Sequence, residues 1–399
     1  MAKDLNKVYN SDSTLYLYSA DIDFVLDGEV HSIETSYIGS IIIDHDYSNN
    51  NMPMVFVTVS IENDLLDLML EHQNTGTVIF NIRQSIANSD MPDLYTEYLS
   101  DEFIYFITDS DDEKISDGKV YKQTTLGLLG LNCINRNKKF INGIVNGNLS
   151  SLMYYVTGHM PVVIEPPSNN VVLKDQVLPP LNSISKMLKY INSLNVFYTT
   201  PFRFYIDFDC AYLISSSGKA VKKEGEKFHT VLLDFRNEYD IAVQNKGMYM
   251  DEEKQLLHLI IDEEDYEISD DHISEKSFSK LSAINASGNA FSKSIDVDDN
   301  SSIVEKVKSI RIMNDNDGFL DNMIASVNQS NIRILAQKEY IDSSKITINK
   351  EFMVKMDEIY NSDIYNGRYL LIRKREIFIR TDDAFSSTTM LMLERVSDK

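Results

Sequence analysis

The chain has 399 residues, 43% of them hydrophobic and 25% charged, which is typical of a globular protein of two or three domains and excludes long disordered stretches. Its formal net charge of −23 argues against a surface that grips nucleic acid, because such binding needs a basic stripe. An acidic wall would instead let DNA slide past it, although the charge alone is more typical of an ordinary soluble acidic protein.

The cysteines and the start of the chain indicate the compartment. Cys133 and Cys210 are far apart in apolar surroundings and are interpreted as buried thiols, and so small a number excludes a disulfide framework or a zinc site. Residues 1–6 lack the apolar core of a signal peptide, and no apolar run approaches the roughly 18 residues that span a bilayer. We therefore expect a protein that is made in a cytosol and stays there.

The first part of the chain predicts a small antiparallel barrel or sandwich with one helix. Residues 14–26 alternate apolar and polar side chains, Asp27-Gly28 suits a tight hairpin turn, and the return strand is expected over residues 33–43. Ser60 can cap a short helix that ends near His72. Further strands are predicted over residues 54–61, 78–82 and 103–108. This order of elements favours neighbouring antiparallel strands.

The middle of the chain is less regular. Residues 116–165 indicate mixed structure punctuated by glycine, and the segment from Pro161 to Pro180 has the composition of a linker. The apolar spacing predicts a helix from about Leu181 to Leu194. An aromatic strand region follows over Phe202 to Ile214.

The part of the chain beyond residue 231 predicts a second β-barrel. Its strands are expected over residues 256–261, 303–313, 332–335, 346–356, 369–372, 377–380 and 388–396. The predicted fold class is therefore mainly β, or α+β. We expect residues 1–165 to form a first barrel domain with a mixed extension, residues 166–230 a linking domain, and residues 231–399 a second barrel domain that can be discontinuous with the linking domain.

Motifs for chemistry are incomplete throughout. Ser215 to Ala220 resembles a phosphate-binding loop, but Leu213 replaces its first glycine and Ala220 its magnesium-binding hydroxyl. Asp315 to Gly318 resembles a calcium loop without the required flanking ligands. The sequence has neither a GxSxG nor an HExxH motif. Its histidines are scattered singly, at His31, His45, His72, His159, His229, His258 and His272. We predict no catalytic, cofactor-binding or metal-binding residues.

Asp207 and Asp209 are the strongest candidates for an enzyme. At i and i+2 on one strand face, two carboxylates could serve a glycosidase if a cleft lay above them, whereas a polar outer face is the ordinary explanation. Cys210 and His229 could form a thiol dyad, but nothing local activates the thiol. A soluble hydrolase that uses Asp207 and Asp209 therefore stays as an alternative to a non-enzymatic protein.

Two runs of residues carry a family likeness. The first is Leu178-Pro179-Pro180-Leu181, a helix, then residues 194–208 with the letters LNVFYTTPFRFYIDF, then Tyr212-Leu213-Ile214-Ser215. The second is Tyr365-Asn366-Gly367-Arg368-Tyr369-Leu370-Leu371, followed by a strand and by Phe385 before a last strand. Over about a third of the chain, these apolar patterns around turns resemble the baseplate hub proteins of contractile phage tails.

The resemblance implies two tail-tube-like antiparallel β-barrel units in each chain. It further implies a homotrimeric ring that adapts the sixfold tail tube to the threefold central spike and lines the DNA channel. The implied partners are the tail spike, the tail tube and other baseplate proteins, in a virion assembled in the host cell cytoplasm. Open barrel edges would pair with those of neighbouring subunits. Stable nucleic-acid binding, membrane insertion, a cofactor and enzymatic activity are not expected.

Another tail-tube or tail adaptor protein would use the same barrels. A closed ring of six identical chains, in place of three, would identify it. An unrelated binding protein is the remaining alternative.

Overall fold

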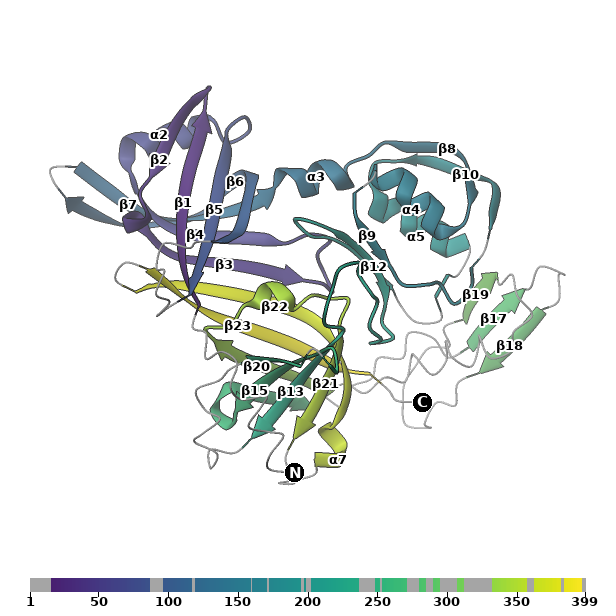
Figure 1. Cartoon of the computed structure of the whole chain (residues 1–399). Helices are drawn as coiled ribbons and strands as arrows, with labels where there is room; N and C mark the ends of the chain where they lie inside the picture. The colour runs from purple at the N-terminus through teal and green to yellow at the C-terminus, as the bar shows by residue number, and fades with distance from the viewer. Residues whose placement is uncertain are drawn as a thin grey trace.

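The computed structural model describes residues 16–86, 96–116, 119–158, 160–170, 172–194, 197–198, 202–236, 248–251, 253–270, 280–284, 290–294, 307–311, 332–356, 362–381 and 384–396. These residues form mainly strands with a few short helices, which confirms the predicted mainly β, α+β fold class. Figure 1 shows two β units stacked on each other, with a third part of mixed helices and strands beside them.

The first β unit is a closed ring of strands. Its members are β1 (Tyr16–Leu26), β2 (Glu29–Ile33), β3 (Ile38–Asp46), β4 (Met54–Glu62), β5 (Thr77–Ile86), β6 (Thr96–Ser116) and β7 (Lys119–Gly130), with the helix α2 (Asn63–Glu71). The order around the ring is β3-β4-β7-β6-β5-β1, and β22 (Gly367–Thr381) and β23 (Ala384–Arg395) complete it. The barrel predicted from the first part of the chain therefore needs two strands, β22 and β23, from the C-terminal part of the chain.

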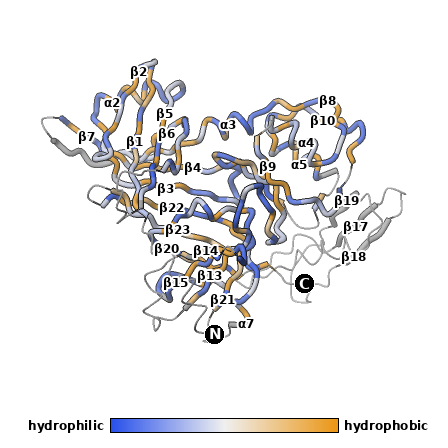
Figure 2. Tube along the Cα trace, viewed as in Figure 1, coloured by the Kyte–Doolittle hydropathy of each residue, from blue (hydrophilic) through white to orange (hydrophobic). Residues whose placement is uncertain are grey.

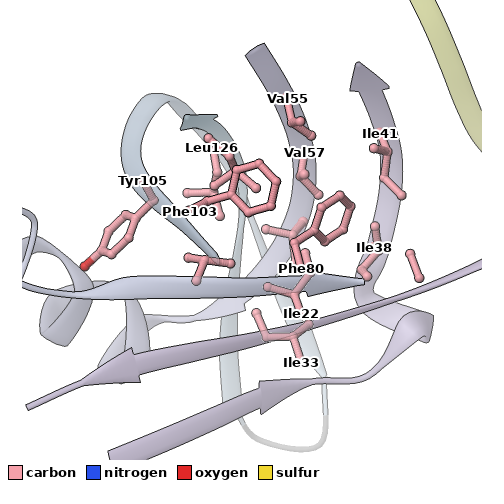
Figure 3. Packing of buried hydrophobic residues seen from close by; sticks show 14 of the residues in the cluster. Ile22, Ile33, Ile38, Ile41, Val55, Val57, Phe80, Phe103, Tyr105 and Leu126 are labelled. Atoms are coloured by element: carbon pink, nitrogen blue, oxygen red, sulfur yellow. The ribbon is translucent and has the colours of Figure 1, made fainter. Parts of the chain in front are cut away.

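Alternation of side chains builds the core of this unit. The alternating apolar side chains from Tyr18 to Leu26 on β1, from Val55 to Ile61 on β4 and from Val78 to Ile82 on β5 are buried. Figure 3 shows Ile22, Val57, Phe80 and Phe103 pointing toward one another inside the ring. The predicted turn is confirmed, because Asp27 and Gly28 have φ values of 50° and 83° and join β1 to β2. The predicted helix begins at Asn63, after Glu62 and not after Ser60.

The middle part has a core of its own. It contains α3 (Leu131–Asn137), β8 (Ile141–Gly147), α4 (Leu149–Thr157), β9 (Val162–Ile164), β10 (Leu173–Leu181), α5 (Ile184–Leu194), β11 (Phe202–Ile206) and β12 (Ala211–Ser215). β8 and β10 form a two-stranded ribbon, and β9, β12 and β11 a small sheet. The predicted helix is confirmed as α5, whereas the segment predicted as a linker carries β9 and β10.

The second β unit combines distant segments. It contains β13 (Thr230–Arg236), β14 (Met248–Asp251), β15 (Leu256–Asp262), β16 (Tyr266–Asp270), β20 (Ile332–Glu339) and β21 (Glu351–Met356). The prediction of antiparallel units is wrong in one respect here, because β13 pairs in parallel with both β15 and β21. Strands β17 (Lys280–Ile284), β18 (Ala290–Ser294) and β19 (Val307–Arg311) form a separate small sheet.

The hairpin of β22 and β23 belongs to both units (Figure 1). β22 pairs with β21 at one end and with β3 at the other, with a bulge at Ile372 where the hairpin passes from one unit to the next. Phe378 and Phe385 lie in the first core, whereas Leu371 and Leu393 lie in the second. The two predicted strands 369–372 and 377–380 are thus one strand. The predicted division at residues 165 and 230 stays a prediction.

Candidate functional site at the junction of the β units

A cavity of about 550 Å³ lies where the two β units and the middle part meet. Its walls include His45 from β3, Asp207 and Asp209 from the turn between β11 and β12, and Lys374 and Glu376 from β22. Ionisable side chains from three parts of the chain thus converge on one space. A cavity of this size and polarity is the first place to look for a function.

A band of buried polar residues separates the two apolar cores along the shared hairpin. Lys374 and Glu376 on β22 and Ser387 and Thr389 on β23 are all buried, at the positions between the apolar side chains of the first and second cores. Buried charges are tolerated only where partners compensate for lost water. The contacts of Glu376 show how this band is held.

Glu376 is the centre of the buried polar band. Its carboxylate accepts hydrogen bonds from Tyr98 and Ser343, lies 3.3 Å from His45 Nε2, and lies 3.5 Å from the Lys374 ammonium. Burial alone would raise the pKa of Glu376, but the positive charge of Lys374 and the hydrogen bonds outweigh it and hold that pKa well below its usual range. The carboxylate therefore stays ionised and is a structural anchor.

His45 connects the two β units to the middle part. Its Nδ1 lies 3.2 Å from the Tyr205 hydroxyl and 3.8 Å from Asp207 Oδ1, while its Nε2 faces Glu376. Burial, followed by the charge of Asp207, raises the pKa of Tyr205 well above its ordinary value. Tyr205 is therefore a neutral hydrogen-bonding group and not a base.

Asp207 and Asp209 are not on one strand face, and this prediction is wrong. β11 ends at Ile206, so both residues lie in the turn that leads into β12. The Asp207 side chain is largely buried beside His45, whereas the Asp209 side chain is 71% exposed and pairs with Lys223 at 2.9 Å. A turn, unlike a strand, does not hold two carboxylates in parallel. The two residues share a cavity wall without the predicted geometry.

Two other cations on this cavity also have acidic partners. Lys350 Nζ lies 3.0 Å from Glu226 Oε1, and Lys345 Nζ lies 3.0 Å from Asp342 Oδ2. Paired charges of this kind orient the walls and fix neighbouring elements, but they leave little charge for a ligand. The arrangement is that of an ion-pair network between parts of a fold.

The remaining candidates do not gather into a site. Burial raises the pKa of the Cys133 thiol to about 12 and that of Cys210 to about 11, so both thiols stay protonated, and the Cys210 thiol donates to the Ala211 carbonyl. In the loop from Ser215 to Ala220, the carboxylate of Glu165 accepts hydrogen bonds from Ser215 and Ser217, where a phosphate would have to bind.

Metal and membrane sites are not seen in the parts of the chain that the structure describes. No group of three or more metal-binding side chains occurs there. Asp315 to Gly318, His159 and His272 lie outside the described residues. No helix among the described residues is both long enough and apolar enough to cross a bilayer.

Sequence reasoning missed the residues at the centre of the site. His45, Lys374 and Glu376 come from strands whose other inward side chains are apolar. The available signal was a polar, ionisable residue at an inward position of a strand, as at His45 after the run Ile41 to Ile43. Unless the neighbouring strands are known, an ionisable residue at such a position cannot be distinguished from one that marks the end of a strand.

Comparisons with known proteins give matches of fold. No family model and no curated protein matches the sequence. Among solved structures, the chain is similar to a tail protein from Neisseria meningitidis MC58, with 11% identity, a TM-score of 0.50 and coverage of 94% of this chain and 97% of that one. Because the identity is so low, this likeness shows a shared fold alone.

Two further solved structures are similar with lower scores. The 43 kDa tail protein of prophage MuSo2 from Shewanella oneidensis has 9% identity, a TM-score of 0.45 and coverage of 94% of this chain and 98% of that one. The prophage tail protein gp18 from Listeria monocytogenes EGD-e has 8% identity, a TM-score of 0.42 and coverage of 95% of each chain.

Proposed function

We propose that this chain is a structural baseplate hub protein of a phage-type tail. The observation that carries the proposal is the pair of β units joined by one continuous hairpin, in a chain with the fold of a tail protein. Three copies would present six β units, which is what an adaptor between a sixfold tail tube and a threefold spike requires. The likeness of residues 178–215 and 365–371 to baseplate hub proteins supports the same reading.

The channel for DNA would lie between copies and not inside a barrel. Apolar side chains fill the interior of both β units, so neither leaves room for a nucleic acid. The net charge of −23 suits walls that repel the DNA backbone and let it pass during ejection. No stable complex with nucleic acid is expected.

In this proposal the junction cavity is a structural device, and the protein is not an enzyme. Its ion pairs hold the two β units at a fixed angle, which a ring of alternating units needs. The partners would be two further copies of the chain, the tail spike, the tail tube and other baseplate proteins. The protein would act in the tail baseplate of a virion assembled in the host cell cytoplasm.

Mass measurement under native conditions tests the proposal. The purified protein would be measured alone and after mixing with the neighbouring tail proteins. A mass of three chains is expected in at least one of these conditions. Six chains would favour a tail-tube or tail adaptor protein, and a single chain in every condition would contradict the proposal.

The cavity beside Asp207 and Asp209 is the one observation that favours the hydrolase alternative. Against it stand the pairing of Asp209 with Lys223 and the enclosure of Asp207 beside His45. Hydrolysis of a panel of aryl glycosides would be compared between the natural chain and the Asp207→Asn and Asp209→Asn variants. Turnover that is lost in both variants would support the hydrolase.

A further inference from the structure

The stretch of the middle part that contains α3, α4, α5 and the β8–β10 ribbon differs in charge from the first β unit. Residues 131–198 hold six basic side chains and two acidic ones in a protein whose net charge is −23. The basic residues are Arg136, Lys138, Lys139, Lys174, Lys186 and Lys189, and the acidic ones are Glu165 and Asp175. Residues 16–130 hold four basic side chains against 21 acidic ones. Two copies of the chain can therefore attract each other through unlike parts.

The basic part also exposes an apolar face on the ribbon of β8 and β10. Ile144 and Val177 are direct partners across the two strands, and 64% and 60% of their surfaces are exposed. Phe140, two residues after the exposed Lys138 and just before β8, is 73% exposed. The alternate positions, among them Leu178, point into the core of the middle part. A cross-strand pair of apolar side chains that is exposed to solvent is typical of a surface that contacts another protein.

The acidic end of the first β unit has the complementary character. We define this end as the turn after β1, the strand β2 and the helix α2. Val30 on β2 and Leu70 on α2 are 61% and 48% exposed. The exposed acidic side chains of these elements are Asp27, Glu29, Asp64, Asp67 and Glu71. Among the described strands β2 pairs with β1 alone, so one of its edges stays open.

These elements form one continuous end of the unit. The backbone that follows α2 packs against the end of β1, because a Cβ added at Gly76 would lie 2.6 Å from Leu26 and 3.1 Å from the His72 carbonyl oxygen. The last turn of α2 and the turn after β1 are therefore neighbours. Exposed apolar and acidic side chains from both elements share this end.

We infer that the outer face of the β8–β10 ribbon of one copy docks on the acidic end of the first β unit of the next copy. The inference rests on the proposed function, since it names the contact that would join hub subunits. Figure 1 places the ribbon and the acidic end at opposite ends of the molecule, so a single chain cannot bring them together. Figure 2 shows hydrophobic and hydrophilic residues interspersed on the ribbon. A contact between two different faces joins copies head to tail and can close a ring.

A double substitution on the ribbon tests the contact. In the full chain, Ile144→Asp with Val177→Asp would place two negative charges against the acidic end and is expected to weaken self-association by about 100-fold, with circular dichroism unchanged. The matched control is Ile379→Asp, which changes an exposed apolar residue of β22 and should leave association as in the natural chain. Association of the natural chain should also weaken at high salt.

Cross-linking between copies provides a test that does not depend on a destabilising charge. The Ile144→Cys chain is mixed with the Val30→Cys chain under oxidation, while both natural cysteines stay buried. A disulfide-linked pair that contains one of each chain is expected, and an Ile379→Cys chain in place of the Val30→Cys chain should give none.

The two proposals fail in different ways. If the natural chain forms rings and both ribbon experiments leave them unaffected and unlinked, the ribbon contact is wrong and the hub proposal stands. If the natural chain stays a single chain at every concentration and with every tail partner, both are wrong.

Discussion

The two β units are built by different routes, although they share a hairpin. In the first unit every described strand pair is antiparallel, and β3 to β7 are supplied by one stretch of chain. In the second unit β13 lies in parallel between β15 and β21, which requires connections that leave the sheet and return. Register in the first unit follows from local alternation and turns, whereas register in the second depends on distant segments.

The shared hairpin allows the stabilities of the two units to be compared by experiment. One half of it packs into each core, and the polar band around Glu376 lies between. If the hairpin and the polar band couple the two units, a destabilising substitution in one unit must also lower the stability of the other. If they do not, each unit unfolds independently.

The largest expected effect comes from the hairpin's own core residues. Phe378→Ala empties part of the first core and is expected to cost about 4 kcal/mol, while Leu393→Ala does the same to the second core at about 3 kcal/mol. Hydrogen exchange measured strand by strand should show lost protection in both units for either variant. Loss restricted to the substituted unit would show that the units are independent.

The next effect comes from the polar band. Glu376→Gln leaves Lys374 buried beside a neutral amide and is expected to destabilise the fold by about 3 kcal/mol, as breaking a buried pair does. Urea unfolding at pH 7 measures this. A variant as stable as the natural chain would show that the ion pairs do not hold the junction.

The same residue determines a pH dependence. Because the folded pKa of Glu376 is depressed, its stabilisation is present above the unfolded pKa of about 4.3 and is lost as pH falls through the folded pKa. The natural chain should therefore lose stability below about pH 4 more steeply than Glu376→Gln. Equal slopes of stability against pH in the two proteins would show that groups other than Glu376 cause the loss of stability in acid.

A smaller effect is expected in the local turn of the first unit. Gly28 has a φ of 83° with open space where a Cβ would lie, so Gly28→Ala brings backbone strain without a clash and should cost about 1 kcal/mol. Thermal unfolding of this variant, with the midpoint compared to that of the natural chain, gives the value. No measurable cost would mean that the turn does not determine the register of β1 and β2.

The smallest effect is expected at Asp209. Its ion pair with Lys223 is exposed, so Asp209→Asn should change stability by no more than about 0.5 kcal/mol. A much larger loss in the same unfolding assay would mean that the turn between β11 and β12 helps to hold the units together.

Sequence reasoning reached as far as local signals allow. Alternation predicted β1, β4 and β5 and their inward faces, and Asp27-Gly28 predicted the hairpin turn. It could not place Lys374 and Glu376 inside a strand, because charged residues between two apolar runs indicate a break unless distant partners are known. The sequence could not predict the cavity beside Asp207 for the same reason, because three separate segments of the chain form its walls.

The rotational symmetry of the assembled ring tests the central claim most directly. Electron microscopy of the protein, alone or bound to its tail partners, should give averages with three identical subunits and six similar lobes, two from each chain. Averages with six identical subunits, or particles of one chain under all these conditions, would contradict the account of two fused β units acting as an adaptor.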